Sequence, residues 1–162
     1  MRVIGVDPGF ATVGFGIIDN EKSRFNVIEY GVISTSAKKS FDLRLLEIYN
    51  DLLYLLDIHK PDCAAIEQLY FTTNQKTVIE VAEARGVILL AARQRGIRIF
   101  EYTPLQVKSA VTGYGKAVKK QVQELTKRIL CLSEIPKPDD AADALAIAIC
   151  HSHSFRSKLI SK

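Results

Sequence analysis

Acidic side chains at three separate places in the chain could together support metal-assisted chemistry. Asp7 ends one short apolar run and Glu67 ends another, while Asp139, Asp140 and Asp143 precede a third. A carboxylate at the open end of a strand is well placed to hold a metal ion or a phosphate-bound metal. Asp7 alone is equally well explained as a residue that caps a turn.

Apolar runs with the pattern of buried strands position the first of these acids. Residues 3–6 form one short run, and residues 12–19 alternate large apolar side chains on one face with Gly14 and Gly16 on the other. Residues 25–34 resume the pattern, so we predict an antiparallel meander of three strands. The glycine face of the second strand would let another element pack close to it.

A helix over residues 40–60 carries the chain from the meander to the next strand. Its apolar side chains repeat at helical spacing until Pro61 stops it, and residues 63–66 then lead to Glu67. A helical connection places this strand parallel to the first in the same sheet. If the two strands are neighbours, the backbones of Asp7 and Glu67 lie about 5 Å apart, and two anions so close need a cation or a raised pKa.

The second half of the chain alternates helices with one strand. We predict a helix over 74–95, a strand over 97–102, a helix capped by Thr103-Pro104, a basic helix over 118–132 and a last helix opening within 136–143. Gly86, inside the first of these helices, costs about 1 kcal/mol relative to alanine. A close packing contact at Gly86, for instance with a second subunit, would explain it.

The first turn of the last helix carries Asp139, Asp140 and Asp143. Asp140 and Asp143 are three residues apart and share a face. Negative side chains are favourable at any helix N-terminus, which accounts for all three without a binding role, and Asp139 serves equally well as the N-cap. Asp143, however, borders an almost wholly apolar stretch, where a charge usually has a partner. We expect no lysine or arginine near it to serve as one.

The length of 162 residues is that of one domain, which we assign to residues 1–162 with a flexible tail from about 154 to 162. No segment approaches the roughly 18 apolar residues that a membrane-spanning helix needs. The N-terminal residues also lack the pattern of a signal peptide, because Asp7 and the glycines interrupt the apolar run. We therefore expect a cytoplasmic protein.

The cysteines and histidines do not form a metal-binding pattern. Cys63, Cys131 and Cys150 are far apart and stand among apolar neighbours, as expected of small core residues in a reducing compartment. We expect His151 and His153 to cap or line the surface of the last helix near its end.

The charge of the chain favours a polyanionic partner. The net charge is +4, and setting aside four of the 18 acidic residues for a metal site leaves 14 against 22 basic ones. The basic residues are densest between Lys108 and Arg128. Phosphate neutralisation with release of counterions drives nucleic-acid binding, so such a surface suits a nucleic acid, although many ordinary domains are equally basic.

Several motifs, in order along the chain, resemble the RuvC family of Holliday-junction resolvases. They are Ile-Gly-Val-Asp-Pro-Gly around Asp7, Ala-Ile-Glu-Gln around Glu67 and Asp-Ala-Ala-Asp-Ala-Leu-Ala-Ile-Ala at 140–148. Further likeness lies in Ala84-Arg-Gly-Val87, Gln106-Val-Lys108 and Lys119-Lys-Gln-Val122. The resemblance extends from Met1 to about His153 and so covers nearly the whole chain.

The resemblance implies a ribonuclease-H-like α/β fold: a five-stranded mixed sheet, three antiparallel strands and then two parallel ones, with helices on both faces. It implies a homodimer that nicks four-way DNA junctions in recombination and repair, with the branch-migration proteins RuvA and RuvB as partners. In that family the positions matching Asp7, Glu67, Asp140 and Asp143 are catalytic and bind two Mg²⁺ ions, for which Mn²⁺ can substitute. Some relatives carry histidine at the fourth position, whereas Asp143 makes this site all carboxylate, which suits hard ions.

Such a site would hydrolyse a phosphodiester without a protein nucleophile. Paired ions about 4 Å apart activate water and stabilise the departing 3′-oxygen, which leaves 5′-phosphate and 3′-hydroxyl ends. Tyr70 and Phe71 would stack on unpaired bases, although a core or dimer contact explains Phe71 nearly as well. Lys108, Lys119 and Lys120 match or adjoin basic positions that approach the DNA backbone in the family.

Three other functions fit parts of the pattern. The Gly-x-Asp-x-Gly start also opens sugar kinases and actin-like ATPases, but those folds repeat the unit and need far more than 162 residues. A junction-binding module without catalysis would not need all four carboxylates. A ribonuclease-H-like nuclease acting on another substrate, such as an RNA–DNA hybrid, stays open.

Overall fold

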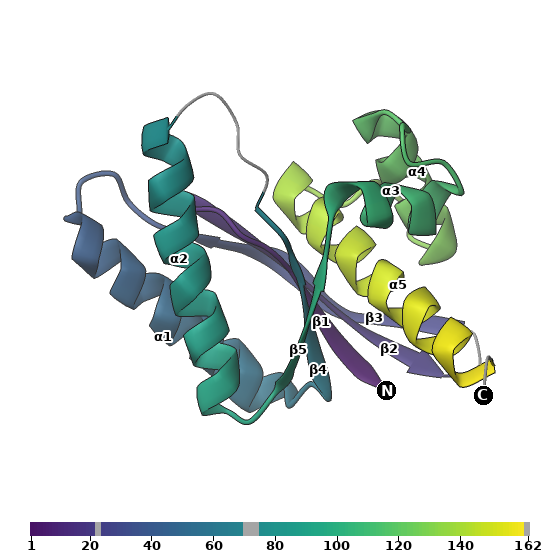
Figure 1. The fold of residues 1–162 in the computed structure, drawn as a ribbon, viewed down its shortest axis with the longest axis horizontal. Helices are drawn as coiled ribbons and strands as arrows, with labels where there is room; N and C mark the ends of the chain where they lie inside the picture. The colour runs from purple at the N-terminus through teal and green to yellow at the C-terminus, as the bar shows by residue number, and fades with distance from the viewer. Residues whose placement is uncertain (22–23, 70–74, 161–162) are drawn as a thin grey trace.

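The strand that ends at Asp7 lies at the centre of a five-stranded mixed sheet in the computed structural model, which describes residues 1–21, 24–69 and 75–160 (Figure 1). The strands are β1 (Arg2–Asp7), β2 (Thr12–Glu21), β3 (Arg24–Ser34), β4 (Cys63–Glu67) and β5 (Arg98–Tyr102), in the order β3-β2-β1-β4-β5. The first three are antiparallel neighbours, and β4 and β5 run parallel to β1. The predicted meander and the predicted parallel direction of β4 in the same sheet are both confirmed, and β4 pairs directly with β1.

Helices cover both faces of the sheet, as expected. They are α1 (Phe41–His59), α2 (Gln75–Gln94), α3 (Pro104–Thr112), α4 (Lys119–Ile129) and α5 (Asp139–Ile160). Figure 1 shows α1 and α2 on one side of the strands and α3, α4 and α5 on the other. The last helix continues to Ile160, well past residue 154, where we expected a tail to begin. No helix of the described residues is long and apolar enough to cross a membrane.

Alternation along the central strands decides which helices the acids face. On β1, Ile4 and Val6 lie in the core under α1 and α2, whereas Val3 lies in the core under α5. Side chains two residues apart on a strand point to the same face, so Asp7 is directed toward the α5 side. The same alternation along β4 directs Glu67 to that side as well.

Glycines let α5 lie directly on the backbone of the sheet. A Cβ added at Gly14 would overlap the backbone carbonyl of Asp140, and one added at Gly5 would overlap that of Ala144. This confirms that the glycine face of β2 receives another element. Because Gly14 pairs with Asp7 across the two strands, the contact seats the first turn of α5 beside the end of β1.

A capping box fixes the start of α3 immediately after β5 ends. The Gln106 backbone N–H donates to Thr103 Oγ1 at 3.2 Å, and the Thr103 backbone N–H donates to Gln106 Oε1 at 2.8 Å. Pro104 is the first residue of the helix, and Gly113 ends it with a left-handed φ of 75°. The predicted cap is confirmed, and it sets the position of Lys108 relative to the sheet.

Two side-chain placements differ from expectation, and the prediction for Gly86 stays open. Among the described residues, nothing lies within 4 Å of the Cβ position of Gly86, so the contact with a second subunit remains a prediction. Cys131 is exposed and has a left-handed φ of 53°. His151 is buried, with Nε2 3.2 Å from Cys63 Sγ and Nδ1 2.8 Å from the Tyr102 hydroxyl oxygen, and so is a core residue.

Candidate active site

Three elements bring the four predicted acids to one edge of the sheet. β1 and β4 are parallel neighbours, so Asp7 and Glu67, their last residues, lie at the same edge. The first turn of α5, which begins beside the end of β4 in Figure 1, adds Asp140 and Asp143. Residues more than 130 positions apart in the chain thus become neighbours.

Burial and mutual repulsion raise the pKa values of the two strand-end acids. Burial, followed by the negative charges of Glu67, Asp143 and Asp140, raises the pKa of Asp7 from 3.8 to about 8. Burial and the charge of Asp143 raise the pKa of Glu67 from 4.5 to about 7, with Lys108 acting in the opposite direction. The carboxylates are therefore close enough to disfavour one another's ionised form, and added positive charge would restore it.

Asp143 has a basic partner, contrary to our expectation. The ammonium of Lys119, at the start of α4, lies 3.0 Å from Asp143 Oδ2 and 3.3 Å from Asp139 Oδ2. Burial nevertheless raises the pKa of Asp143, against the influence of Lys119. Burial lowers the pKa of Lys119, but contacts with the two carboxylates outweigh burial and leave this pKa above its ordinary value.

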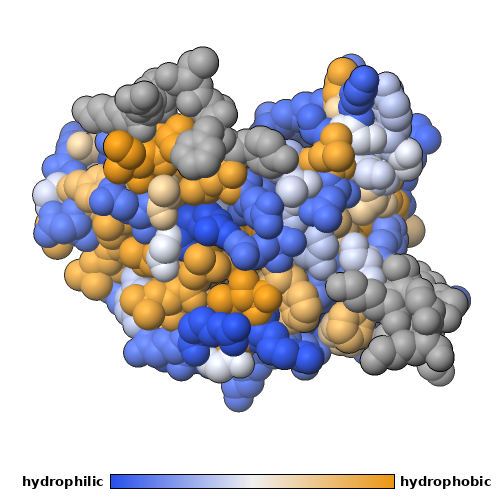
Figure 2. All heavy atoms as spheres, viewed as in Figure 1, coloured by the Kyte–Doolittle hydropathy of each residue, from blue (hydrophilic) through white to orange (hydrophobic). Residues whose placement is uncertain are grey.

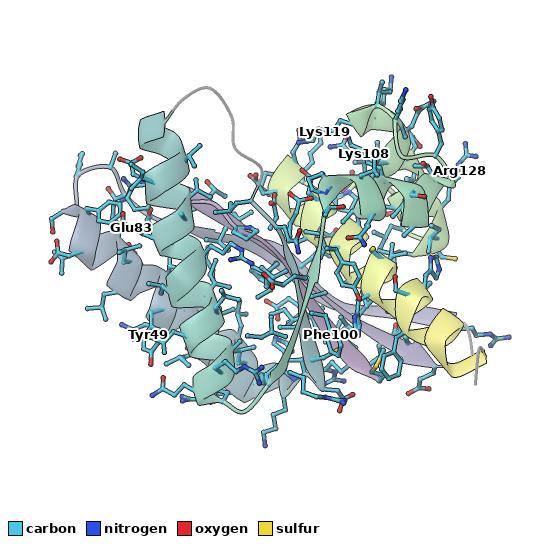
Figure 3. All side chains as sticks on the ribbon, in the orientation of Figure 1. Tyr49, Glu83, Phe100, Lys108, Lys119 and Arg128 are labelled. Carbon is cyan, nitrogen blue, oxygen red and sulfur yellow. The ribbon has the colours of Figure 1, made fainter. Side chains whose placement is uncertain are left out.

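Two of the four acids and two lysines line a hollow of about 230 Å³. Its lining consists of Glu67, Pro104, Val107, Lys108, Lys119, Val122, Asp143 and Ala146. Figure 3 shows Lys108 and Lys119 at the end of the molecule where α5 begins. A hollow that presents carboxylates and ammonium groups together can receive cations and a phosphate at once.

The donor set suits hard divalent cations. Carboxylate oxygens are the ligands that Mg²⁺ prefers, and the raised pKa values of Asp7 and Glu67 mean that positive charge would be favourable here. Within the described residues, no three acidic, histidine or cysteine side chains converge closely enough to ligate one ion. The acids are neighbours, with the Lys119 ammonium against Asp143, and binding an ion would require them to draw together.

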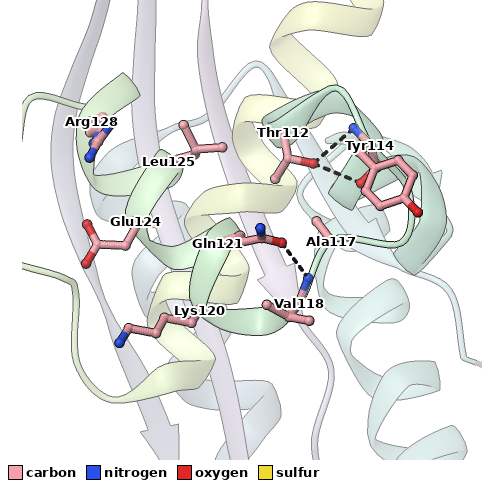
Figure 4. A pocket seen from close by; sticks show the side chains of 9 residues that line it. All are labelled: Thr112, Tyr114, Ala117, Val118, Lys120, Gln121, Glu124, Leu125 and Arg128. Carbon is pink, nitrogen blue, oxygen red and sulfur yellow. Dashed lines mark hydrogen bonds between the residues drawn. The ribbon is translucent and has the colours of Figure 1, made fainter.

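Lys120 is not brought to the carboxylates. Consecutive helical residues point about 100° apart, so Lys119 and Lys120 face different directions from α4. Lys120 contributes to a separate hollow of about 440 Å³ (Figure 4). Its lining is Thr112, Tyr114, Ala117, Val118, Lys120, Gln121, Glu124, Leu125 and Arg128. None of the four acids lines this larger hollow, so its size is no argument for chemistry there.

Tyr70 and Phe71, which we expect to stack on DNA bases, lie outside the described residues. Their role stays a prediction from the sequence. The metal-binding and catalytic roles of the four acids also stay predictions. The structure shows that these acids are neighbours.

Arg85 supports the strand end that carries Glu67, a role that sequence reasoning missed. It is half-buried on α2, its Nε lies 3.4 Å from the Glu67 carbonyl oxygen, and its guanidinium pairs with the Glu101 carboxylate on β5. Arg85 lies in the motif Ala84-Arg-Gly-Val87, but the motif did not indicate that Arg85 contacts Glu67 and Glu101.

The turn after Asp7 is braced by a second arginine that the sequence did not single out. The Arg44 guanidinium lies 3.6 Å above the Phe10 ring, and its Nε donates to Thr35 Oγ1 at 2.9 Å. Thr35 Oγ1 in turn donates to the Phe10 carbonyl at 2.9 Å. These contacts tie the turn that follows β1 to β3 and α1, which limits its freedom to carry Asp7 away from the edge.

Comparison with known proteins gives one consistent result. Residues 3–151 match the sequence profile of the family described as "Crossover junction endodeoxyribonuclease RuvC". A protein of that name from Fusobacterium nucleatum is 56% identical over 159 residues, which cover 98% of this chain and 84% of the relative. Another, from Syntrophomonas wolfei, is 55% identical over 156 residues, covering 96% of this chain and 91% of the relative.

Solved structures agree with the sequence matches. Thermus thermophilus RuvC in complex with Holliday junction substrate matches with a TM-score of 0.93 at 33% identity, over 98% of this chain and 96% of that chain. The yeast mitochondrial Holliday junction resolvase Ydc2 shares the fold, with a TM-score of 0.72 at 15% identity over 98% of this chain and 82% of that chain. The chain therefore belongs to the RuvC family of crossover junction endodeoxyribonucleases, and its fold is the ribonuclease-H-like one.

Proposed function

We propose that this protein is a Holliday-junction resolvase, an endonuclease that cuts four-way DNA junctions by hydrolysing phosphodiester bonds. The observation that carries the proposal is the convergence of Asp7, Glu67, Asp140 and Asp143 at one edge of the sheet, with Lys108 and Lys119 beside them. Its relatives at more than half identity carry the name of this activity. A structure of similar fold is solved with a Holliday junction.

The four acids are proposed as the ligands of two Mg²⁺ ions, with Mn²⁺ as a substitute. When bound, such ions activate water and stabilise the charge that develops on the departing oxygen, giving 5′-phosphate and 3′-hydroxyl ends. The protein's own part is to bring carboxylates from β1, β4 and α5 to the same edge of the sheet, where bound ions would draw them together. Burial at the strand ends keeps Asp7 and Glu67 poorly solvated and disfavours their ionised forms, so bound cations would restore the negative charge that ligates them.

The two lysines beside the acids are proposed to hold the phosphate backbone of the substrate. Lys108 is half-buried on α3, whose start is fixed by the capping box, and Lys119 is held by two carboxylates. An ammonium group recognises a phosphate as a point charge and reads no base. These lysines would therefore align the strand for cleavage without selecting its sequence.

A homodimer is proposed because a four-way junction has near two-fold symmetry and paired nicks need two related sites. α2 presents an unpaired stripe for a second copy: Ile79 is 59% exposed, Leu90 is 61% exposed, and Gly86 between them is open. The three residues lie at helical spacing on one face. Figure 2 shows apolar residues exposed over the side of the molecule formed by α1 and α2.

The proposal extends to the setting of the reaction. We expect the protein to work in the cytoplasm, in recombination and repair, with the branch-migration proteins RuvA and RuvB delivering the junction. These expectations rest on the family to which the chain belongs.

The test is cleavage of a synthetic four-way junction with and without Mg²⁺. We expect paired, symmetric nicks that carry 5′-phosphates, and no product in EDTA. A linear duplex of the same sequence and an RNA–DNA hybrid serve as matched substrates. Faster cleavage of the hybrid would assign the site to another nuclease activity, and junction binding without nicks under any divalent cation would indicate a binding module.

A further inference from the structure

The first turns of α4 and α5 are joined by an acid outside the proposed metal-binding set. Asp139 Oδ2 lies 3.3 Å from the Lys119 ammonium, and Asp139 Oδ1 accepts a hydrogen bond from Gln123 Nε2 at 3.0 Å. Lys119 and Gln123 are four residues apart on α4, so they share a face and reach the same carboxylate. Both oxygens of Asp139 are thus directed at α4.

The helix dipole does not explain this arrangement. A negative charge in the first turn of α5 is favourable wherever its carboxylate points. Asp139, at 63% side-chain exposure, could remain solvated and retain that benefit. Its direction toward Lys119 and Gln123 therefore needs a further reason.

Lys119 is held by two carboxylates that differ in role. Asp143, at 32% exposure, belongs to the proposed catalytic set, whereas Asp139 does not. Ligands that engage Asp143 would remove one partner of Lys119 and leave Asp139 in place. A lysine has a long side chain that loses considerable rotamer entropy when it is fixed, so a remaining partner keeps the ammonium near the hollow at lower cost.

We propose that Asp139 and Gln123 are positioning residues that hold the Lys119 ammonium at the hollow, where it meets the phosphate of the bound DNA strand. Asp139 supplies the charge that retains the ammonium, and Gln123 fixes the orientation of the Asp139 carboxylate. The inference rests on the proposed nuclease function. It adds a pair of residues that themselves contact neither the scissile bond nor a metal ion.

The first experiment compares Asp139→Asn with Glu134→Gln in full-length protein. Each substitution removes one negative charge, and Glu134 is exposed in the segment between α4 and α5. With saturating junction and Mg²⁺, we expect the single-turnover rate of Asp139→Asn to fall about two- to fivefold below that of Glu134→Gln, the range expected for an exposed ion pair. In EDTA, fluorescence anisotropy should show that Asp139→Asn binds the junction at least as tightly as Glu134→Gln, because an acid near the phosphates has been removed.

The second experiment asks whether Asp139 acts through Lys119. In a Lys119→Ala background, Asp139→Asn should change the rate by less than about 1.5-fold, since the interaction is already absent. Asp139→Glu should recover most of the lost rate, and Gln123→Ala should lower it by less than Asp139→Asn does.

The outcomes separate this inference from the proposed function. If the wild-type protein cuts junctions but Asp139→Asn and Glu134→Gln have equal rates, Asp139 has no positioning role. A full additional loss in the Lys119→Ala background would likewise overturn the inference, because the effect would not depend on Lys119. If the wild-type protein cuts no junction under any divalent cation, the proposed function itself is wrong.

Discussion

The surroundings at the two ends of β1 shift the pKa of a carboxyl group in opposite directions. At its start, the Arg2 guanidinium donates to both oxygens of Asp19 at 2.9 and 2.8 Å and to the His59 carbonyl at 2.9 Å. The hydrogen bond from Arg2 holds the pKa of Asp19 below its ordinary value. At the other end, burial and three neighbouring acids raise the pKa of Asp7 to about 8.

One end of this six-residue strand therefore carries a structural ion pair, and the other end carries an acid with a proposed functional role. At the Arg2 end, the guanidinium and the Asp19 carboxylate neutralise each other. The Asp7 end gathers more negative charge than the nearby lysines neutralise, and a buried acid among acids makes folding less favourable. The proposed binding of cations and DNA at this end would offset that cost.

Of the substitutions at the two ends of β1, Asp7→Asn should have the largest effect. Because the amide removes one anionic oxygen ligand from the proposed site, we expect cleavage of a four-way junction in Mg²⁺ to fall by about a thousandfold. Binding of the junction in EDTA should survive. The matched substitution, Asp19→Asn at the opposite end of the sheet, should leave the cleavage rate within about twofold. An active Asp7→Asn protein would defeat the proposed mechanism.

Gly14→Ala tests whether the acidic edge depends on the seating of α5. The new methyl group would overlap the Asp140 carbonyl, so the helix must move, and we expect the free energy of unfolding to fall by roughly 1–3 kcal/mol, together with the cleavage rate. Gly31→Ala on β3 is the control, since its Cβ would only approach the Phe15 ring, at 3.2 Å. Urea unfolding of both variants should therefore show the larger loss at Gly14.

The pH dependence of stability should have opposite signs at the two ends. Asp7 has a folded-state pKa of about 8 against 3.8, so the folded protein binds more protons between these values and its stability falls as pH rises toward 8. In EDTA, unfolding between pH 5.5 and 8.5 should show this decline. Asp7→Asn should make the decline shallower, leaving the part that the raised pKa of Glu67 contributes, and should be more stable than wild type at pH 8.5, by roughly 1–4 kcal/mol.

Asp19 provides the control of opposite sign. Its pKa is lowered, so its contribution is present above its ordinary value of 3.8 and is lost as pH falls through the lower, folded-state pKa. Asp19→Asn should therefore leave the slope between pH 5.5 and 8.5 unchanged and lower stability by less than about 1 kcal/mol, because the pair is partly exposed. If Asp7→Asn kept the wild-type slope, Asp7 would not be the source of the decline.

The sequence is sufficient to predict the edge that carries Asp7 and Glu67. Each acid ends a short apolar run, and a helix of clear period separates the two runs, so two parallel strands with both acids at the same edge of the sheet follow from connection rules, whereas the structure shows that they are neighbours. The glycines of β2 likewise predict that another element packs closely against this strand. These signals are local in the chain or depend on a rule that holds for nearly all folds.

Contacts between exposed side chains of different helices could not be predicted in this way. Lys119 and Asp139 are 20 residues apart on separate helices, and no periodicity relates them. His151 on α5 contacts Cys63 on β4 and Tyr102 on β5, so its burial depends on how the helix packs against these two strands. The separation of Lys120 from Lys119, by contrast, follows from helix geometry and was predictable.

The cap at Thr103 has a mechanical consequence for substrate capture. α3 begins directly after β5, and β5 is paired with β4, so Lys108 is attached to the sheet without slack. A side chain on an already ordered backbone loses less conformational entropy when it meets a phosphate. In the proposed complex, a force from DNA on Lys108 would be transmitted through β5 to β4, the strand that ends at Glu67, and would therefore link binding of the substrate to alignment of this acid.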